Sequence, residues 1–402
     1  MNRQPFARPP RHWPPRLSPW WIRLCRPLRN RTLRRDQRLA RIETQGLEHL
    51  RLALDDHVGV LITPNHSFHY DSNVLYEVAD RVRRPFHFLT AWQVFAMSSR
   101  FDQWSLQRHG CYSIDRENND IQAFKLSVDI LRESAYPLVI FPEGDIYHTN
   151  DRVTPFRDGA AAVALAAARR ADRRIVCIPC ALKWWFLDDP TPKLLALMDR
   201  LERRLLWRPR PELTLPERIY RLAGGLLALK EQEYFGSVQP GTVAERRDRL
   251  IDAVLRRLEV RHKVKKLADT VPERVKALRR EVIARQCEAD LTDDEQGTLA
   301  AEMEELFTVV QMYSYPGDYV AERPSIERIA ETLDKFEEDL FHVTYPGVRG
   351  QRRVVVRFGE PIEVPRQRSK KDDSSELTLL LEKRVQGLLD ALNVENGKKT
   401  RI

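Results

Sequence analysis

The sequence predicts an α/β fold in which a mixed, mostly parallel sheet is flanked by helices and interrupted by an all-helical insertion. The first observation is that short apolar runs alternate with amphipathic stretches over the first half of the chain. The second is that residues 188–345 show helical periodicity with few strand signals, after which strand character returns. With 402 residues, 42% of them hydrophobic, the chain can bury a large core.

The expected strands are short apolar runs that end at turn residues. Because the runs are apolar throughout, they indicate strands buried on both faces of the sheet. Helices are expected between them, from residue 71, over 118–133 and over the alanine-rich segment 159–170. The strands are expected at residues 58–63, 86–89, 112–114, 138–141 and 175–182.

The insertion is divided by helix punctuation, with proline near helix starts and glycine just after an end. Its helices are expected over 193–207, 216–235, 243–265, 272–288, 293–313 and 325–341. A strand over 353–358 should then rejoin the first sheet, and a last helix should cover 376–393. The chain therefore divides into a basic aromatic arm (1–40), an α/β domain (41–187), the insertion (188–345) and a return strand and helix that complete the α/β domain (346–402).

The formal net charge of +9 is concentrated in the first fifty residues, where twelve arginines stand against Asp36, Glu43 and Glu48. Such an arm attracts an anionic lipid surface or nucleic acid by the same Coulomb interaction, unless it packs on the core. Tryptophans are interleaved with these arginines, and indole rings favour the headgroup region of a bilayer. We therefore expect the arm to bind an anionic membrane surface and not nucleic acid.

The cysteine content and the hydropathy favour a protein of the cytoplasm that lies on the cytoplasmic face of a membrane. Five irregularly spaced cysteines do not form a disulfide framework. No segment reaches the roughly eighteen apolar residues of a membrane-spanning helix, and the N-terminus lacks the apolar core of a secretion signal. Cys177 and Cys180 have the spacing of a redox or zinc motif, but they lie in an apolar run and are expected in the core.

The densest polar cluster of the α/β part runs from Asn65 to Asp71, where a strand ends and a helix begins. Open α/β sheets place their sites at such strand ends. A histidine can take the proton of an attacking hydroxyl, and a carboxylate five residues later can fold back to fix its tautomer. His66 and Asp71 suit that pairing, although an isolated H-x4-D spacing also fits a histidine that only caps a helix.

Three further clusters follow in order, each at an expected strand. They run from Gly110 to Arg116, from Phe141 to Gly144 and from Ile178 to Cys180. With these four blocks, residues 40–187 resemble the glycerophospholipid acyltransferase family, of which lysophosphatidate acyltransferase is the best-known member. Segments 155–160 and 356–362 are also similar to that family.

The resemblance implies an enzyme without a cofactor that transfers a fatty acyl chain in phospholipid biosynthesis. The donor would be acyl-CoA or an acyl-carrier protein, and the acceptor the hydroxyl of a lysophospholipid such as 1-acyl-sn-glycerol-3-phosphate. His66 would be the general base and Asp71 its partner. The resemblance further implies that Asn65, Gly110, Arg116, Glu143, Gly144 and Pro179 bind substrate, with Gly110 and Arg116 at a phosphate, Glu143 and Gly144 at the acceptor and Pro179 at the acyl donor.

One departure from the family leaves the acceptor open. The family commonly continues the Glu-Gly pair with Thr and Arg, whereas this chain has Asp145 and Ile146. Either Arg152 or Arg157 reaches the phosphate from a longer loop, or the acceptor is not lysophosphatidate, because Asp145 repels phosphate.

Because an acyl thioester is already activated, Cys111 is expected to be a packing residue and not a nucleophile.

The sequence also allows two other interpretations of the function. The protein could instead be a metal-dependent hydrolase in which His66, His69 and Asp71 bind zinc or iron, completed by His87, His109 or His148. It could also be a membrane-associated scaffold with an inactive core.

Overall fold

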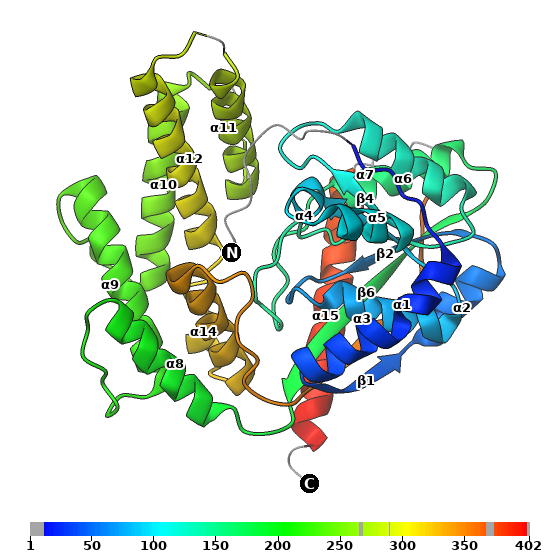
Figure 1. Cartoon of the computed structure of the whole chain (residues 1–402), viewed down its shortest axis with the longest axis horizontal. Helices are drawn as coiled ribbons and strands as arrows, with labels where there is room; N and C mark the ends of the chain where they lie inside the picture. The colour runs from blue at the N-terminus through cyan, green and yellow to red at the C-terminus, as the bar shows by residue number, and fades with distance from the viewer. Residues whose placement is uncertain (1–11, 265–267, 289, 367–373, 400–402) are drawn as a thin grey trace. The chain divides into compact units, whose positions relative to one another are not determined.

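The computed structural model describes residues 12–264, 268–288, 290–366 and 374–399. Its chain contacts divide it into two compact units (Figure 1). The sheet unit takes the described residues of Pro9–Asp115, Asp120–Asp189 and Val348–Ile402. The helical unit takes those of Arg116–Asn119 and Pro190–Gly347.

An eight-stranded mixed sheet forms the centre of the sheet unit, which confirms the predicted fold class. The strand order is β1-β7-β6-β2-β5-β3-β4, and β8 pairs with β6 off this path. All neighbours are parallel except β6 with β7 and β6 with β8. The strands are β1 (Leu39–Gln45), β2 (Gly59–Pro64), β3 (His87–Ala91), β4 (Cys111–Ile114), β5 (Leu138–Val139), β6 (Ile175–Phe186), β7 (Arg352–Phe358) and β8 (Ile362–Glu363).

The strand β7 joins the sheet between β1 and β6, although the helical unit separates it from β6 in the sequence. Two strands, β1 and β8, were not predicted. β1 lies at the sheet edge, pairs with β7 alone and has only one fully buried residue, Leu39. An edge strand of this kind has no continuous apolar run in its sequence.

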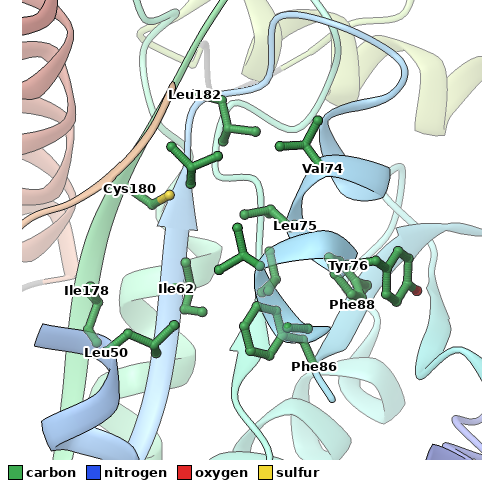
Figure 2. Packing of buried hydrophobic residues seen from close by; sticks show 14 of the residues in the cluster. Leu50, Ile62, Val74, Leu75, Tyr76, Phe86, Phe88, Ile178, Cys180 and Leu182 are labelled. Atoms are coloured by element: carbon green, nitrogen blue, oxygen red, sulfur yellow. The ribbon is translucent and has the colours of Figure 1, made fainter. Parts of the chain in front are cut away.

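Helices cover both faces of the sheet, because its strands are apolar on both sides. In β2, Val60 and Ile62 pack in one cluster with residues of α2 and α3, whereas Leu61 packs in a second cluster with residues of α6 and α7. Figure 2 shows Ile62 and Ile178 of the sheet beside Leu50 in the first cluster. The helices of this unit are α1 (Pro19–Arg31) with a following π-helical turn (Thr32–Asp36), α2 (Leu47–Asp55), α3 (Asp71–Val82), α4 (Trp92–Ala96), α5 (Arg100–Arg108), α6 (Ile121–Glu133), α7 (Gly159–Arg170) and α15 (Ser374–Lys399).

The same alternation separates the two cysteines of β6. Cys177 packs in the cluster with α7, and Cys180 in the cluster with α3. Three residues apart in a strand, they lie on opposite faces of the sheet, so they cannot bind one metal ion or form a disulfide with each other. Both thiols are fully buried, which agrees with the core position expected for them.

The helical unit contains each of the six predicted insertion helices. Three of them begin with a capping box, in which Thr214, Thr242 or Thr292 bonds to a glutamate three residues later. Their apolar faces pack on one another around Leu255, Leu278 and other buried aliphatic residues. The helices are α8 (Thr191–Arg204), α9 (Leu215–Phe235), α10 (Val243–Arg261), α11 (Val271–Gln286), α12 (Asp293–Tyr313), the short α13 (Tyr319–Glu322) and α14 (Ile326–Phe341).

The described part of the arm packs on the sheet unit. The Trp13 ring stacks on Phe95 with 5.3 Å between centroids. The backbone N–H of Trp13 donates to Ser113 Oγ, and the N–H of Ser113 donates to the Trp13 carbonyl. The arm then forms α1, of which Ile22 is buried. Across the described ranges, none of the helices combines the length and the apolar character needed to cross a bilayer.

Candidate active site

The loop between β2 and α3 holds the predicted catalytic pair. β2 ends at Pro64, and α3 begins at Asp71. Because β2 is parallel to its neighbours β5 and β6, this loop lies at the carboxyl edge of the central strands. The Nδ1 atom of His66 lies 3.0 Å from Oδ2 of Asp71. The structure therefore brings the two residues together as predicted.

The carboxylate of Asp71 is the centre of a hydrogen-bond network. Oδ2 also accepts from the backbone N–H groups of Ser67 at 2.8 Å and Phe68 at 2.9 Å. Oδ1 accepts from the indole Nε1 of Trp184 at 2.9 Å. Asp71 is completely buried and is the first residue of α3, where the helix dipole favours a negative charge. Its orientation is thus fixed from several sides.

The imidazole of His66 is oriented for proton transfer. An ionised carboxylate can only accept, so Nδ1 carries the proton towards Asp71 and Nε2 keeps its lone pair. Within the described ranges, Nε2 has no hydrogen-bond partner. The ring stacks on Phe141 with 4.0 Å between centroids, and 17% of the side chain is exposed. This arrangement leaves one basic nitrogen accessible to a substrate.

Glu143 lies beneath the loop instead of facing solvent. Its Oε1 accepts from the backbone N–H of His66 at 2.7 Å, and its Oε2 accepts from the backbone N–H of Thr154 at 2.9 Å. Burial raises the pKa of Glu143 to about 8, although the two N–H donors lower it in part. Glu143 therefore joins the His66 loop to the loop that follows β5.

Gly144 has a left-handed backbone with a φ of +76°, and Arg157 packs directly on it. A Cβ atom at Gly144 would lie 2.6 Å from Nε of Arg157, so a larger residue would displace the guanidinium. The backbone N–H of Arg157 donates to the carbonyl of Pro142, which holds the two segments side by side. Arg157 forms no ion pair with any residue that the structure describes.

Asn65 and Pro179 both form hydrogen bonds with the protein backbone. The side-chain amide of Asn65 bonds to the backbone N–H and carbonyl of Leu182, which joins the end of β2 to β6. Pro179 lies within β6 opposite Thr63, and its carbonyl accepts from the N–H of Gly359. Asn65 is 1% exposed. Their contacts with substrate remain predictions.

Gly110 and Arg116 stand at opposite ends of β4. Gly110 precedes the strand, has a φ of +88°, and a Cβ atom there would lie 2.5 Å from the Phe86 carbonyl oxygen. That is the amino edge of the parallel strands, so the structure does not bring Gly110 to His66, and backbone geometry accounts for the glycine. Arg116 follows β4 and groups with the helical unit, so its place at a phosphate remains a prediction.

Of the residues in the metal interpretation, His69 and His148 lie within ligand distance of each other, but His66 and Asp71 do not join them. The ring of His69 faces that of His148, with 5.7 Å between centroids, whereas His66 bonds to Asp71. Among the described residues, the group of three potential ligands within reach of one another includes neither His66 nor Asp71. His87 and His109 lie at the amino edges of β3 and β4. The geometry at His66 is that of an acid–base pair.

Several residues of this site could not be recognised from the local sequence, because they contact it from distant segments. Trp184, Phe141 and Thr154 touch the catalytic loop from β6 and from the loop after β5. A buried tryptophan inside an apolar strand needs an acceptor for its indole N–H, so the sequence alone could have suggested that Trp184 bonds to a buried polar group. Nothing in the local sequence marks Thr154, which acts through its backbone.

Glu143 should give the protein a pH-dependent stability that Glu143→Gln lacks. As pH rises from about 4.5 to about 8, the unfolded chain releases this proton while the native chain keeps it, so the native state loses up to about 1.4 kcal/mol per pH unit. Urea unfolding at pH 5.5, 6.5 and 7.5 should therefore show the wild type losing stability relative to Glu143→Gln. The exposed Glu133→Gln is the matched control, and parallel curves for wild type and Glu143→Gln would contradict the burial effect.

The comparison with known proteins agrees with this geometry. The family model described as Acyltransferase matches residues 41–183, which contain β2, the His66 loop, Glu143 and most of β6. A comparison with curated proteins finds no match. The resemblance to the glycerophospholipid acyltransferase family is thus confirmed over residues 41–183, the part of the chain that the Acyltransferase model matches.

Proposed function

We propose that this protein transfers a fatty acyl chain from acyl-CoA or an acyl-carrier protein to the hydroxyl of a lysophospholipid such as 1-acyl-sn-glycerol-3-phosphate. The match to the Acyltransferase family supports acyl transfer in general. The observation that carries the finer proposal is the His66–Asp71 pair, which leaves Nε2 as an accessible base at the carboxyl edge of the sheet. The proposal places the enzyme in phospholipid biosynthesis on the cytoplasmic face of a membrane.

In this mechanism the acceptor hydroxyl is the nucleophile. Nε2 of His66 takes its proton as the oxygen attacks the thioester carbonyl, and Asp71 stabilises the imidazolium that forms. When the tetrahedral intermediate collapses, the C–S bond breaks and the leaving thiolate receives the proton from His66. The acyl chain then forms an ester with the acceptor, and the free thiol of the donor is the second product.

The cysteines near the sheet are unsuited to a covalent step. Burial raises the pKa of the Cys111 thiol, so it stays protonated, and its sulfur lies 3.4 Å from the Tyr76 hydroxyl. Burial likewise raises the pKa of Cys180, which the charge of Asp71 reinforces. Neither thiol is accessible, which favours direct attack by the substrate hydroxyl.

Arg157 supports a phosphate-bearing acceptor. The family's arginine is absent after Gly144, but the guanidinium of Arg157 reaches Gly144 from the longer loop. It has no carboxylate partner in the described part of the chain, so its charge is available to an anionic ligand. This arrangement offsets the negative charge that Asp145 brings to the same turn.

Replacing the catalytic pair should abolish transfer without unfolding the protein. His66→Ala removes the base, and we expect kcat to fall by about 10²- to 10⁴-fold. Asp71→Asn should lose most activity as well, because an amide cannot stabilise the imidazolium. The assay follows a labelled acyl chain from acyl-CoA to lysophospholipid, with circular dichroism as the control for folding. Near-normal turnover of His66→Ala would refute the mechanism.

Arg157→Ala should distinguish acceptors by their charge. With 1-acyl-sn-glycerol-3-phosphate we expect kcat/KM to fall by about 10- to 100-fold, because a charged hydrogen bond is lost. With monoacylglycerol, which lacks the phosphate, the change should stay within about twofold. The exposed Arg169→Ala serves as the control. Equal losses with both acceptors would exclude Arg157 as a phosphate ligand, and a wild-type preference for monoacylglycerol would exclude the phosphate-bearing acceptor.

The enzyme's proposed membrane contact is an apolar patch formed by α1 and α5. Trp20, Leu24 and Leu28 recur at every fourth residue of α1 and are 69%, 54% and 64% exposed. Phe101 of α5 is 62% exposed, and Trp21 of α1 lies 4.7 Å, centroid to centroid, from Trp104 of α5. The two helices therefore present one continuous apolar surface.

The rim of this patch favours an anionic bilayer as its partner. Arg23, Arg31 and Arg100 are exposed on the two helices and form no ion pairs within the described ranges. Apolar side chains that insert below the headgroups, together with arginines that contact lipid phosphates, are the features of interfacial helices. A lipid substrate would then reach the enzyme without leaving the membrane.

The triple variant Trp20→Ala, Leu24→Ala, Phe101→Ala should bind anionic vesicles at least about tenfold more weakly, because three inserting side chains are truncated. The measurement is co-sedimentation with phosphatidylglycerol-containing vesicles, compared with pure phosphatidylcholine and with high salt. The control replaces Leu206, Leu229 and Val260, which are 94%, 69% and 78% exposed in the helical unit. Equal weakening by both sets of replacements would contradict a specific docking patch.

A further inference from the structure

The catalytic carboxylate has one oxygen that its own loop does not contact. Oδ2 of Asp71 accepts hydrogen bonds from His66, Ser67 and Phe68. Oδ1 accepts from a distant residue, the indole Nε1 of Trp184 on β6. Because Asp71 is 0% exposed, Oδ1 would be left without a donor if this indole N–H were removed. The carboxylate would then turn to share Oδ2's donors between its two oxygens.

Trp184 is held in place by its backbone as well as by its ring. The side-chain amide of Asn150 accepts from the Trp184 N–H at 2.9 Å and donates to the Trp184 carbonyl at 2.8 Å. The indole contacts Phe68 edge to face, with 5.4 Å between ring centroids. Phe68 belongs to the catalytic loop, so the ring touches that loop in two ways. A ring fixed from both ends can hold Asp71 in one orientation.

A buried arginine lies on the same indole. The guanidinium carbon of Arg352 is 5.0 Å from the Trp184 ring centroid and 5.5 Å from that of Phe68. Its Nη2 donates to the carbonyl and the side-chain oxygen of Gln37, and Arg352 is 8% exposed. A cation over the ring face attracts its π electrons, which makes the indole N–H a stronger donor. Arg352 is the first residue of β7, the strand that returns after the helical unit.

We propose that Trp184 is a positioning residue for catalysis, which orients Asp71 towards His66 through its indole N–H while Arg352 and Phe68 fix the ring. The expected effect on kcat rests on the proposed function, whereas the hydrogen bond between Trp184 and Asp71 does not. The indole N–H of Trp184 bonds to Asp71 and not to Nε2 of His66, the reacting nitrogen. Its effect should therefore appear in kcat and pass through Asp71 alone.

Trp184→Phe keeps a ring between Phe68 and Arg352 and removes only the donor. We expect kcat to fall by about 10- to 100-fold with KM within about twofold, the size of a hydrogen bond to a buried charge. The matched control is Trp185→Phe, the next residue, whose ring packs with α15 on the other face of the sheet. The control should retain wild-type kcat. A Trp184→Phe enzyme with normal kcat would overturn the proposal.

A double-mutant cycle separates a positioning role from a loss of packing. In an Asp71→Ala background, Trp184→Phe should change kcat by less than about twofold, because the residue through which it acts is gone. If Trp184→Phe costs the same factor in both backgrounds, Trp184 acts through the core instead, and the proposal fails.

The hydrogen bond itself can be tested without activity. The chain has eight tryptophans, and ¹⁵N spectra of the indole N–H groups should show one resonance that moves upfield in Asp71→Ala. This measurement decides the structural part even if Trp184→Phe does not fold or if the wild type transfers no acyl chain to any lysophospholipid. If no indole resonance moves, Trp184 does not bond to Asp71 and the proposal is wrong. Absence of transfer by the wild type would instead refute the proposed function.

Discussion

The buried carboxylate of Asp71 is the constraint on which the rest of the site depends. A charge with no exposure to water is stable only when hydrogen-bond donors replace its hydration, and here four donors from two segments do so. Those donors require the loop after β2 to curl over the first turn of α3, and they require β6 to extend as far as Trp184. The direction of the His66 imidazole follows from these contacts.

The second constraint is Glu143, a buried carboxyl group that accepts hydrogen bonds from two backbone N–H groups. Through it the loop after β5 supports the backbone of His66, while Phe141 supports the ring. The loop after β2 and the loop after β5 therefore contribute to one small site. The first loop is bonded to Trp184 of β6 through Asp71, and Glu143 of the second is bonded to the backbone of Thr154. The position of His66 depends on contacts between segments that are far apart in the sequence.

Much of the fold could be predicted from local pattern. The alanine-rich helix α7 begins and ends at the predicted residues, and so does α12, because capping and composition act locally. The His66–Asp71 pairing was also predictable, since five residues suffice for the carboxylate to fold back. Helices α1, α2, α4 and α5 were not predicted. In α1 and α5 the exposed aromatic residues Trp20 and Phe101 obscure the amphipathic pattern, and α4 is only five residues long.

The roles of the other site residues could not be predicted from the sequence, because they depend on long-range contacts. Asn65 was predicted to bind substrate, and nothing in the local sequence indicates that its amide also joins β2 to a residue of β6 far along the chain. Gly110 precedes a strand, and only the strand direction shows that it lies at the edge away from His66. By contrast, Arg157 could be named in advance, as one of two arginines in the loop after Gly144, and the structure shows that its guanidinium packs on Gly144.

The order of the strands also affects how the chain matures. From Cys180 to Phe186, β6 pairs with β7, which a ribosome would synthesise only after the whole helical unit. Closing that contact is slow because the intervening chain must first be brought together. Until then the second half of β6 is an open sheet edge, which is a template for aggregation. A nascent chain, or one cut before β7, would contain His66 and Asp71 but not the strand that pairs with β6 at Trp184.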